Sequence, residues 1–176
     1  MHRRGLMVAL MGAWLSGCVH HEITVRATTA PVTGRRLVTR AQAFARYISA
    51  MHRQIHQAYT LGFLADIDAR KDASCADQTL WTQLAIAVDA DGRLDGVAVA
   101  RKSGLQAFDV AVVERVTATA PFPPPPDAIK SADGKVHLDW QFHRDERSCG
   151  TFGVDPHVYG PAGNELGLAE TVEDRD

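Results

Sequence analysis

Hydrophobic residues recur with two different periods along this chain. From residue 41 to residue 62 they fall at spacings of four, three, four and four, which is typical of one face of an amphipathic helix. This face consists of Phe44, Ile48, Met51, Ile55 and Tyr59. A second helix is predicted from about Gln106 to Ala118, with an inner stripe of Phe108, Val112, Val116 and Ala120. Pro121 ends that helix, because a proline ring disfavours the helical conformation of the preceding residue.

Strict alternation of apolar and polar residues predicts three strands, over 80–88, 94–100 and 135–143. The first two flank an Asp-Gly turn at 89–93, so we expect a β-hairpin. In the third strand the outward-facing positions are His137, Asp139, Gln141 and His143. The order is helix, hairpin, helix, strand. Because a small sheet must bury one face under helices, we expect an α+β, two-layer sandwich with a three-stranded antiparallel sheet.

The first eighteen residues have the pattern of an export signal. His2, Arg3 and Arg4 precede an apolar run that is too short to span a bilayer, and the run closes on Leu-Ser-Gly-Cys at 15–18. This ending resembles a bacterial lipobox, which predicts a signal peptide over 1–17 and a lipid on Cys18. The alternative is a plain secretory signal with an incidental cysteine. Residues 18–40 lack sustained periodicity and are expected to form a lipid-anchored tether.

Cys75 and Cys149 remain as an even pair if Cys18 carries lipid. In an oxidising compartment they are expected to form a disulfide, with two free thiols as the alternative. Neither lies in a CxxC motif or a Cys/His cluster in the sequence. His52 and His56 are four apart on the first helix and would supply half a metal site, but no third ligand follows at matching spacing. We therefore expect a solvated face there, with no metal and no cofactor.

Composition and motifs argue against two classes of function, nucleic-acid binding and catalysis. The chain of 176 residues is 45% hydrophobic, 23% charged and has a net charge of -2, so nucleic acid is not the expected partner. Its aspartates are scattered over turns and an outward strand face, and no Gly-x-Ser-x-Gly elbow surrounds Ser103. We therefore expect no catalytic residues and no enzymatic activity.

The segment AIAVDADGRLDGVAVARKSGLQAFDVAVVERVTATAPFPPPP, residues 85–126, resembles the C-terminal domain shared by TonB and TolA. Strand, Asp-Gly turn, strand, Ser-Gly step, Asp-led helix and proline-rich break occur in that order. With the flanking helix and the last strand, the resemblance covers about residues 41–145. It implies a domain over 41–149. The Gly- and Pro-rich segment that follows, 150–176, is expected to be a flexible tail.

The resemblance also implies a periplasmic, non-enzymatic binding module. Such a module pairs an exposed sheet edge with an extended segment of an envelope protein, for example an outer-membrane receptor. The third strand is the expected contact, with partner-binding candidates Lys135, His137, Asp139, Gln141 and His143. That strand is expected beside the first one, which would bring Cys149 near Cys75.

One departure from the TonB and TolA pattern concerns the membrane. Those proteins carry an N-terminal membrane helix and a long spacer, whereas this chain has a lipobox and a tether of about 25 residues. The expected role is therefore a lipid-anchored adaptor in the cell envelope. The alternative is a structural lipoprotein that stabilises a multiprotein assembly without energy transduction. Val19 follows Cys18 where inner-membrane retention favours Asp, so the outer membrane is the expected location.

Overall fold

The computed structural model describes residues 36–70 and 75–174, and the expected order of helix, hairpin, helix and strand occurs with further elements before and after it. The N-terminal part contains β1 (Arg36–Thr39), α1 (Arg40–Ala58), the π-helical segment η1 (Tyr59–Leu64) and α2 (Ala65–Arg70). The central part contains β2 (Trp81–Val88), β3 (Leu94–Arg101), α3 (Gln106–Thr119) and β4 (Val136–His143). Two further strands follow, β5 (Val154–His157) and β6 (Thr171–Asp174), and single 3-10 turns occur at Asp127–Ile129 and Thr151–Gly153.

The start of α1 is set by a capping box. Thr39 lies at the N-cap in an extended conformation, and its hydroxyl accepts a hydrogen bond from the backbone N–H of Gln42 at 3.2 Å. The side chain of Gln42 in turn accepts from the backbone N–H of Thr39 at 3.0 Å. The two bonds satisfy donors that a helix N-terminus otherwise leaves without partners.

The main sheet is antiparallel, with strand order β3-β2-β4-β5. The hairpin of β2 and β3 and the last predicted strand, β4, are confirmed. β4 lies beside β2 in unbroken register, from Trp81 opposite His143 to Val88 opposite Val136. The prediction of three strands was one strand short in this sheet, because β5 pairs with β4 from His137 to Trp140.

The C-terminal segment differs from the flexible tail expected over 150–176. It contributes β5 to the main sheet, and β6 pairs with β1 in a separate two-stranded sheet. Val158 is almost fully buried, and its carbonyl accepts a hydrogen bond from the N–H of Leu166 at 2.8 Å. The sequence signal was weak because β5 has four residues and contains Pro156, which strand patterns tolerate only at a sheet edge.

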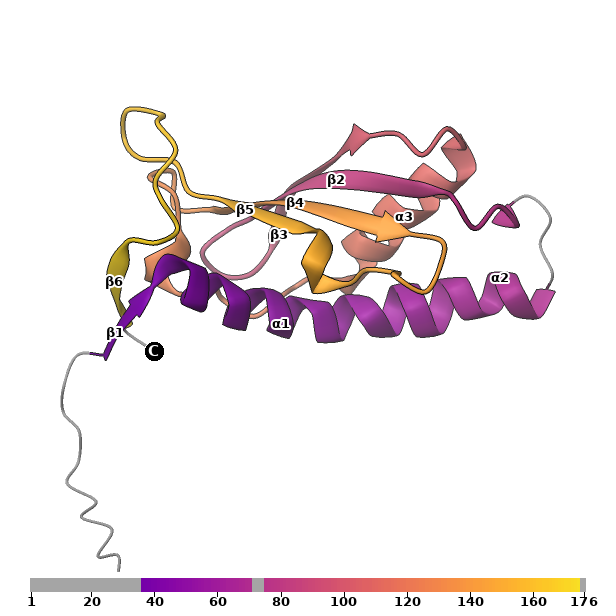
Figure 1. Ribbon diagram of the computed structural model, residues 1–176, viewed down its shortest axis with the longest axis horizontal. Helices are drawn as coiled ribbons and strands as arrows, with labels where there is room; N and C mark the ends of the chain where they lie inside the picture. The colour runs from indigo at the N-terminus through magenta and orange to yellow at the C-terminus, as the bar shows by residue number, and fades with distance from the viewer. Residues whose placement is uncertain (1–35, 71–74, 175–176) are drawn as a thin grey trace, which may run out of the picture. The chain divides into compact units, whose positions relative to one another are not determined.

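One face of the main sheet packs against α1 and α3, and Figure 1 shows α1 running along that side of the strands. The sheet contributes inward side chains from β2 and β4, among them the fully buried Leu84, Trp140 and Phe142. The helices contribute Phe44, Met51, Ile55, Tyr59, Phe108, Val112 and Val116. The α+β, two-layer fold is thus confirmed, and its other sheet face is left for solvent or a partner.

Candidate partner-binding surface

β3 forms one end of the main sheet. It pairs with β2, and no described strand lies against its other side. A strand in this position leaves a row of backbone N–H and C=O groups available to another extended chain. The side chains of β3 are half-buried or exposed along its whole length, in contrast to those of β4. β3 is therefore the eight-residue end of the sheet that another strand can join, whereas β5 at the other end has only four residues.

A groove of about 480 Å³ lies between this edge and α3. Its apolar lining comes from Val99 on β3 and from Val110 and Val113 on α3, while Lys102 and Glu114 supply charges of both signs. Val110 is 48% exposed, which is high for a valine beside a hydrophobic core. An extended peptide on the β3 edge could place alternate side chains in this groove, because successive side chains of a strand point to opposite faces.

Local structure places α3 to form the groove. Gly104 has a positive φ of 97° in the turn before the helix. The backbone N–H of Ser103 donates to Asp109 Oδ1 at 2.9 Å, which connects the turn to the first helical turn. The core stripe of α3 then points at the sheet, so the remaining valines face the β3 side. The sequence carried a signal for this groove, since α3 has apolar residues outside its inner stripe.

The partner-binding residues predicted on the last strand occupy a different environment from the one expected. β4 is an inner strand, paired with β2 on one side and with β5 from His137 to Trp140 on the other. Its outward side chains and Lys135, just before the strand, have partners within the molecule. Lys135 Nζ lies 2.7 Å from Asp95 Oδ2, His137 Nε2 lies 3.0 Å from Asp133 Oδ2, and Asp139 accepts from Gln83 Nε2 at 3.1 Å. The sequence did not predict that β4 is an inner strand, because β5, which pairs with it, comes from the segment expected to be a tail.

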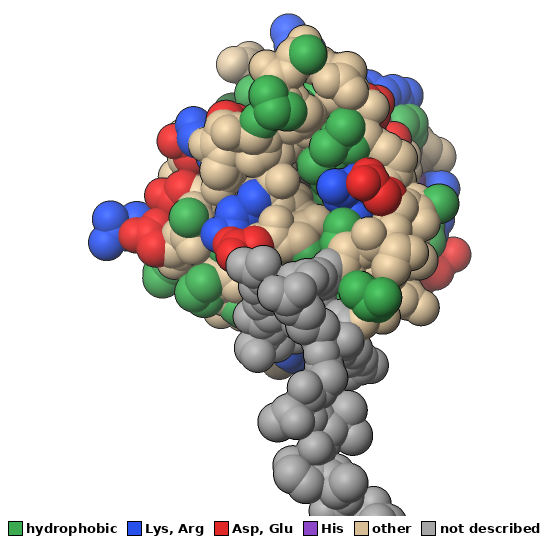
Figure 2. All heavy atoms as spheres, turned by 90° about the vertical axis from the view of Figure 1, so that its left-hand side faces the viewer, with side chains coloured by type: hydrophobic (Ala, Val, Ile, Leu, Met, Phe, Trp, Pro, Cys, Tyr) green, Lys and Arg blue, Asp and Glu red, His purple; other side chains and the backbone are tan. Residues whose placement is uncertain are grey.

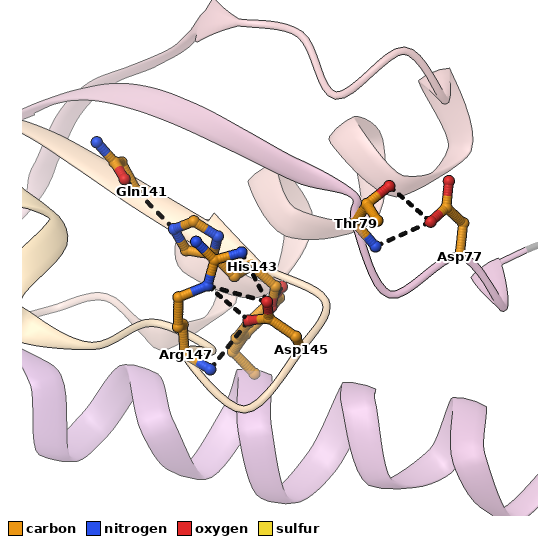
Figure 3. Close-up of polar contacts among 7 residues, drawn as sticks. Asp77, Thr79, Gln141, His143, Asp145 and Arg147 are labelled. Atoms are coloured by element: carbon orange, nitrogen blue, oxygen red, sulfur yellow. Dashed lines mark hydrogen bonds and ion pairs between the residues drawn. The ribbon is translucent and has the colours of Figure 1, made fainter.

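The end of β4 is closed by the loop that follows it. His143 is buried, its ring stacks on Trp81 with a centroid distance of 5.5 Å, and its Nε2 lies 3.3 Å from Gln141 Oε1. Figure 3 shows His143 and Gln141 beside Asp145 and Arg147. The carboxylate of Asp145 and the guanidinium of Arg147 lie 2.6 Å apart. Burial, together with the charge of Arg147, lowers the pKa of His143. This corner is an intramolecular polar network.

The solvent side of the sheet has a second hollow, of about 510 Å³. Its floor is made by small residues of β2 and β3, namely Ala85, Ala87, Gly96 and Ala98. Its wall contains His137, Asp139, His157 and Tyr159. His157 Nδ1 lies 2.8 Å from Glu165 Oε1. Burial alone would lower the pKa of His157, but this hydrogen bond and nearby carboxylates outweigh it, so the pKa is raised.

At the end of the molecule that carries β1 and β6, the surface has a mixed character. Figure 2 shows hydrophobic side chains there as separate spots between polar atoms and charged side chains of both signs. Leu37 on β1 is exposed, whereas Arg40 at the start of α1 forms an ion pair with Glu170. The described side chains visible in that view form no continuous apolar surface.

Cys75 and Cys149 are both buried, and the structure records no bond between them. Arg144 Nε donates to the carbonyl of Cys75 at 2.8 Å, and Trp140 Nε1 donates to that of Cys149 at 3.1 Å. Burial raises the pKa of Tyr59 above its usual range, and both cysteines add to this effect. Cys75 and Cys149 thus both lie near the buried hydroxyl of Tyr59. A disulfide between them stays a prediction.

The first helix brings His52 and His56 to Cys149. The donor atoms of the three side chains all lie within 4.8 Å of one another. No third ligand follows these histidines at matching spacing in the sequence, whereas the structure brings Cys149 to them from the loop after β4. Cys18 lies outside the described residues, and none of the described helices is long and apolar enough to cross a membrane.

The comparisons with known proteins give one family match and one similar solved structure. A family model described as the TonB C terminal matches residues 44–138, so the chain belongs to the TonB C-terminal family. Among solved structures, the C-terminal domain of HasB is 24% identical, with 73% of this chain and 99% of that chain covered and a TM-score of 0.37. A search of curated proteins gave no match. TonB C-terminal domains are non-enzymatic modules that generally mediate protein–protein interaction in envelope transport systems.

The matched region ends at Leu138, inside β4. It contains α1 from Phe44 onward, the hairpin and α3, which form the two layers around the core. β5 and β6 lie beyond it, so the strand that covers β4 belongs to the part of this chain outside the family match.

Proposed function

We propose that this protein is a lipid-anchored adaptor of the cell envelope that captures an extended segment of another envelope protein at the β3 edge. The observation that carries the proposal is an open strand edge beside an apolar groove with a charged rim. Backbone pairing with β3 supplies affinity, and side-chain pockets supply specificity. The proposal moves the contact from β4, where the sequence suggested it, to β3.

The chemistry of the groove describes the partner. Its occupant is a strand-forming segment with apolar side chains at alternate positions, because Val99, Val110 and Val113 line the cavity. Lys102 and Glu114 place opposite charges at the rim, which favours one direction of the bound segment over the other. An outer-membrane receptor or an assembly subunit with such a segment fits this description.

The anchor is part of the same proposal. Cys18 ends the Leu-Ser-Gly-Cys sequence, so it is assigned the lipid, and Val19 favours the outer membrane. With a lipid in place of a membrane helix, the protein would hold its partner near the membrane without transducing energy itself. Intact mass of the mature protein tests the anchor directly. We expect the mass of a chain that carries a diacylglyceryl group on Cys18. We expect that added mass to be missing from the Cys18→Ser variant.

Site-specific photo-crosslinking tests the binding edge. A photoreactive residue at Lys102 is expected to give one dominant adduct in cells, and Val110→Asp is expected to abolish it by placing a charge in the apolar groove. The matched control is Leu61→Asp, since Leu61 is an exposed apolar residue in η1, outside the groove. An adduct that persists in Val110→Asp, or disappears equally in Leu61→Asp, would contradict capture at β3. A purely structural lipoprotein would give that result.

A further inference from the structure

Three metal-binding side chains converge where α1 passes the loop after β4. His52 and His56 stand one turn apart on α1, with ring centroids 5.3 Å apart. Cys149 approaches from the loop, and the donor atoms of the three residues all lie within 4.8 Å of one another. The cluster is distant in sequence from the β3 groove and shares no lining residue with it.

The backbone on both sides of the cluster is held firmly. On α1, Met51 and Ile55 are almost completely buried in the core, so the helix cannot rotate the two histidines away without exposing them. On the loop, the carbonyl of Cys149 accepts from Trp140 Nε1, and the neighbouring Ser148 carbonyl accepts from the N–H of His143 at 2.7 Å. Placement of the donors therefore depends on side-chain rotation alone.

The donor types indicate which ions would bind. Two imidazole nitrogens and one thiolate suit borderline-soft ions such as Zn²⁺, whereas Mg²⁺ and Ca²⁺ prefer oxygen. Zinc bonds are about 2.0–2.1 Å to nitrogen and about 2.3 Å to sulfur. The donor atoms of the three side chains lie within 4.8 Å of one another, so side-chain rotation can bring all three to bonding distance of one ion. The two histidines are half-buried while Cys149 is fully buried, so the histidine side offers the approach from solvent.

We propose that His52, His56 and Cys149 bind a Zn²⁺-class ion, with a fourth position open to water or to a partner's side chain. Binding converts the thiol of Cys149 to a thiolate as the sulfur–metal bond forms, and the proton passes to solvent. The site needs Cys149 as a thiol, so a Cys75–Cys149 disulfide would close it. The sulfur of Cys149 can therefore either bind the metal or form the disulfide, but not both at once.

Cobalt titration tests the site, because Co²⁺ reports its ligands by colour. The probe is the full chain with Cys18→Ser, reduced and titrated with Co²⁺ alone. We expect one equivalent to produce a near-ultraviolet sulfur-to-cobalt band and visible bands of tetrahedral cobalt, both displaced by Zn²⁺. Oxidation before titration is expected to remove them.

Variants assign the ligands. His52→Gln and His56→Gln are each expected to weaken Co²⁺ binding at least about tenfold, the size that loss of even an outer-sphere partner can cause. Cys149→Ser is expected to remove the sulfur band. Cys75→Ser and His157→Gln are controls and are expected to bind as the parent does. Circular dichroism of each metal-free variant shows whether it is folded.

Two results would overturn the proposal. One is a folded, reduced parent that gives no sulfur-to-cobalt band. The other is a band that survives in both histidine variants, since the half-buried histidines can be replaced without opening the core. The crosslinking experiment at Lys102 is unaffected by either result, so this proposal and the proposed function fail separately.

Discussion

The two sides of the sheet's central strand pair, β2 and β4, end differently. Beyond β2 lies β3, a full-length strand whose outer side is open and adjoins an apolar groove. Beyond β4 lies β5, four residues long and containing Pro156. A short, proline-containing strand is a poor template for further pairing. The C-terminal segment therefore ends one side of the sheet with a short strand, and β3 is the better place for a partner strand to pair.

Burial follows the same division. On β4, every second residue from Val136 to Phe142 is completely or almost completely buried under the helices. On β3, the helix-facing Val97 and Val99 remain half-buried. The covered side should thus carry most of the folding free energy, and the open side most of the binding. Three sets of substitutions test how stability is distributed over the molecule, in order of decreasing effect.

The largest effect is expected from Trp140→Ala. Trp140 has no exposed surface, and its indole N–H donates to the carbonyl of Cys149. Removing a buried tryptophan costs about 3–5 kcal/mol of unfolding free energy, whereas the half-buried Val99→Ala should cost about 1 kcal/mol. Urea denaturation measures both. Trp140→Phe provides a milder variant, and equal losses for Trp140→Ala and Val99→Ala would refute the division.

A smaller loss is expected from Gly92→Ala in the turn between β2 and β3. Gly92 has a φ of 86°, and an added Cβ would lie 2.0 Å from the carbonyl oxygen of Phe122. The segment before the four prolines rests there, with the N–H of Phe122 donating to the carbonyl of Gly92 at 2.8 Å. We expect a loss of about 1–3 kcal/mol from backbone strain.

The matched control for this change is Gly96→Ala on β3. An added Cβ at Gly96 meets no atom within 4 Å, and its φ is not positive. We expect this variant to unfold at the same urea concentration as the parent or slightly higher. If Gly96→Ala destabilised the protein as much as Gly92→Ala, the packing of residue 122 on the turn would not explain the loss.

The smallest effect concerns His157 on β5. Its pKa is raised in the folded state by Glu165 and neighbouring carboxylates, which outweigh burial. Its contribution to stability is therefore full below the unfolded pKa of about 6.5 and disappears as pH rises through the folded pKa. His157→Gln should cost less than about 1 kcal/mol at pH about 5.5, because Glu165 is exposed, and nothing at pH about 8.5.

Glu165→Gln checks the cause, since it removes the hydrogen-bond partner of His157 Nδ1. Urea midpoints at the two pH values should show a loss with the same pH dependence. A loss that is equal at both pH values would mean that His157 acts through packing alone.

Local periodicity was enough to predict much of this fold. The stripe from Phe44 to Tyr59, the alternation in β2 to β4 and the Asp-Gly turn each involve residues close in sequence, so their spacing reports which face is buried. The stop at Pro121 was equally local. The short strands β1, β5 and β6 could not be found in this way, because four residues give too few alternations.

The two candidate sites depend on contacts between distant segments, which the spacing of residues along the sequence does not reveal. The residues predicted for partner binding alternated correctly on β4, but β5 occupies the edge that this prediction required. Cys149 joins His52 and His56 only because the loop after β4 folds back against α1.

By itself, the sequence determined the type and order of the central helices and strands, the apolar faces that must pack together and the family to which they belong. Tertiary structure alone decided which strand ends the sheet, where the apolar groove opens and which side chains meet at α1. The physical reason is that burial imposes a period on neighbouring residues, whereas strand order and side-chain convergence arise from contacts between segments far apart in the chain.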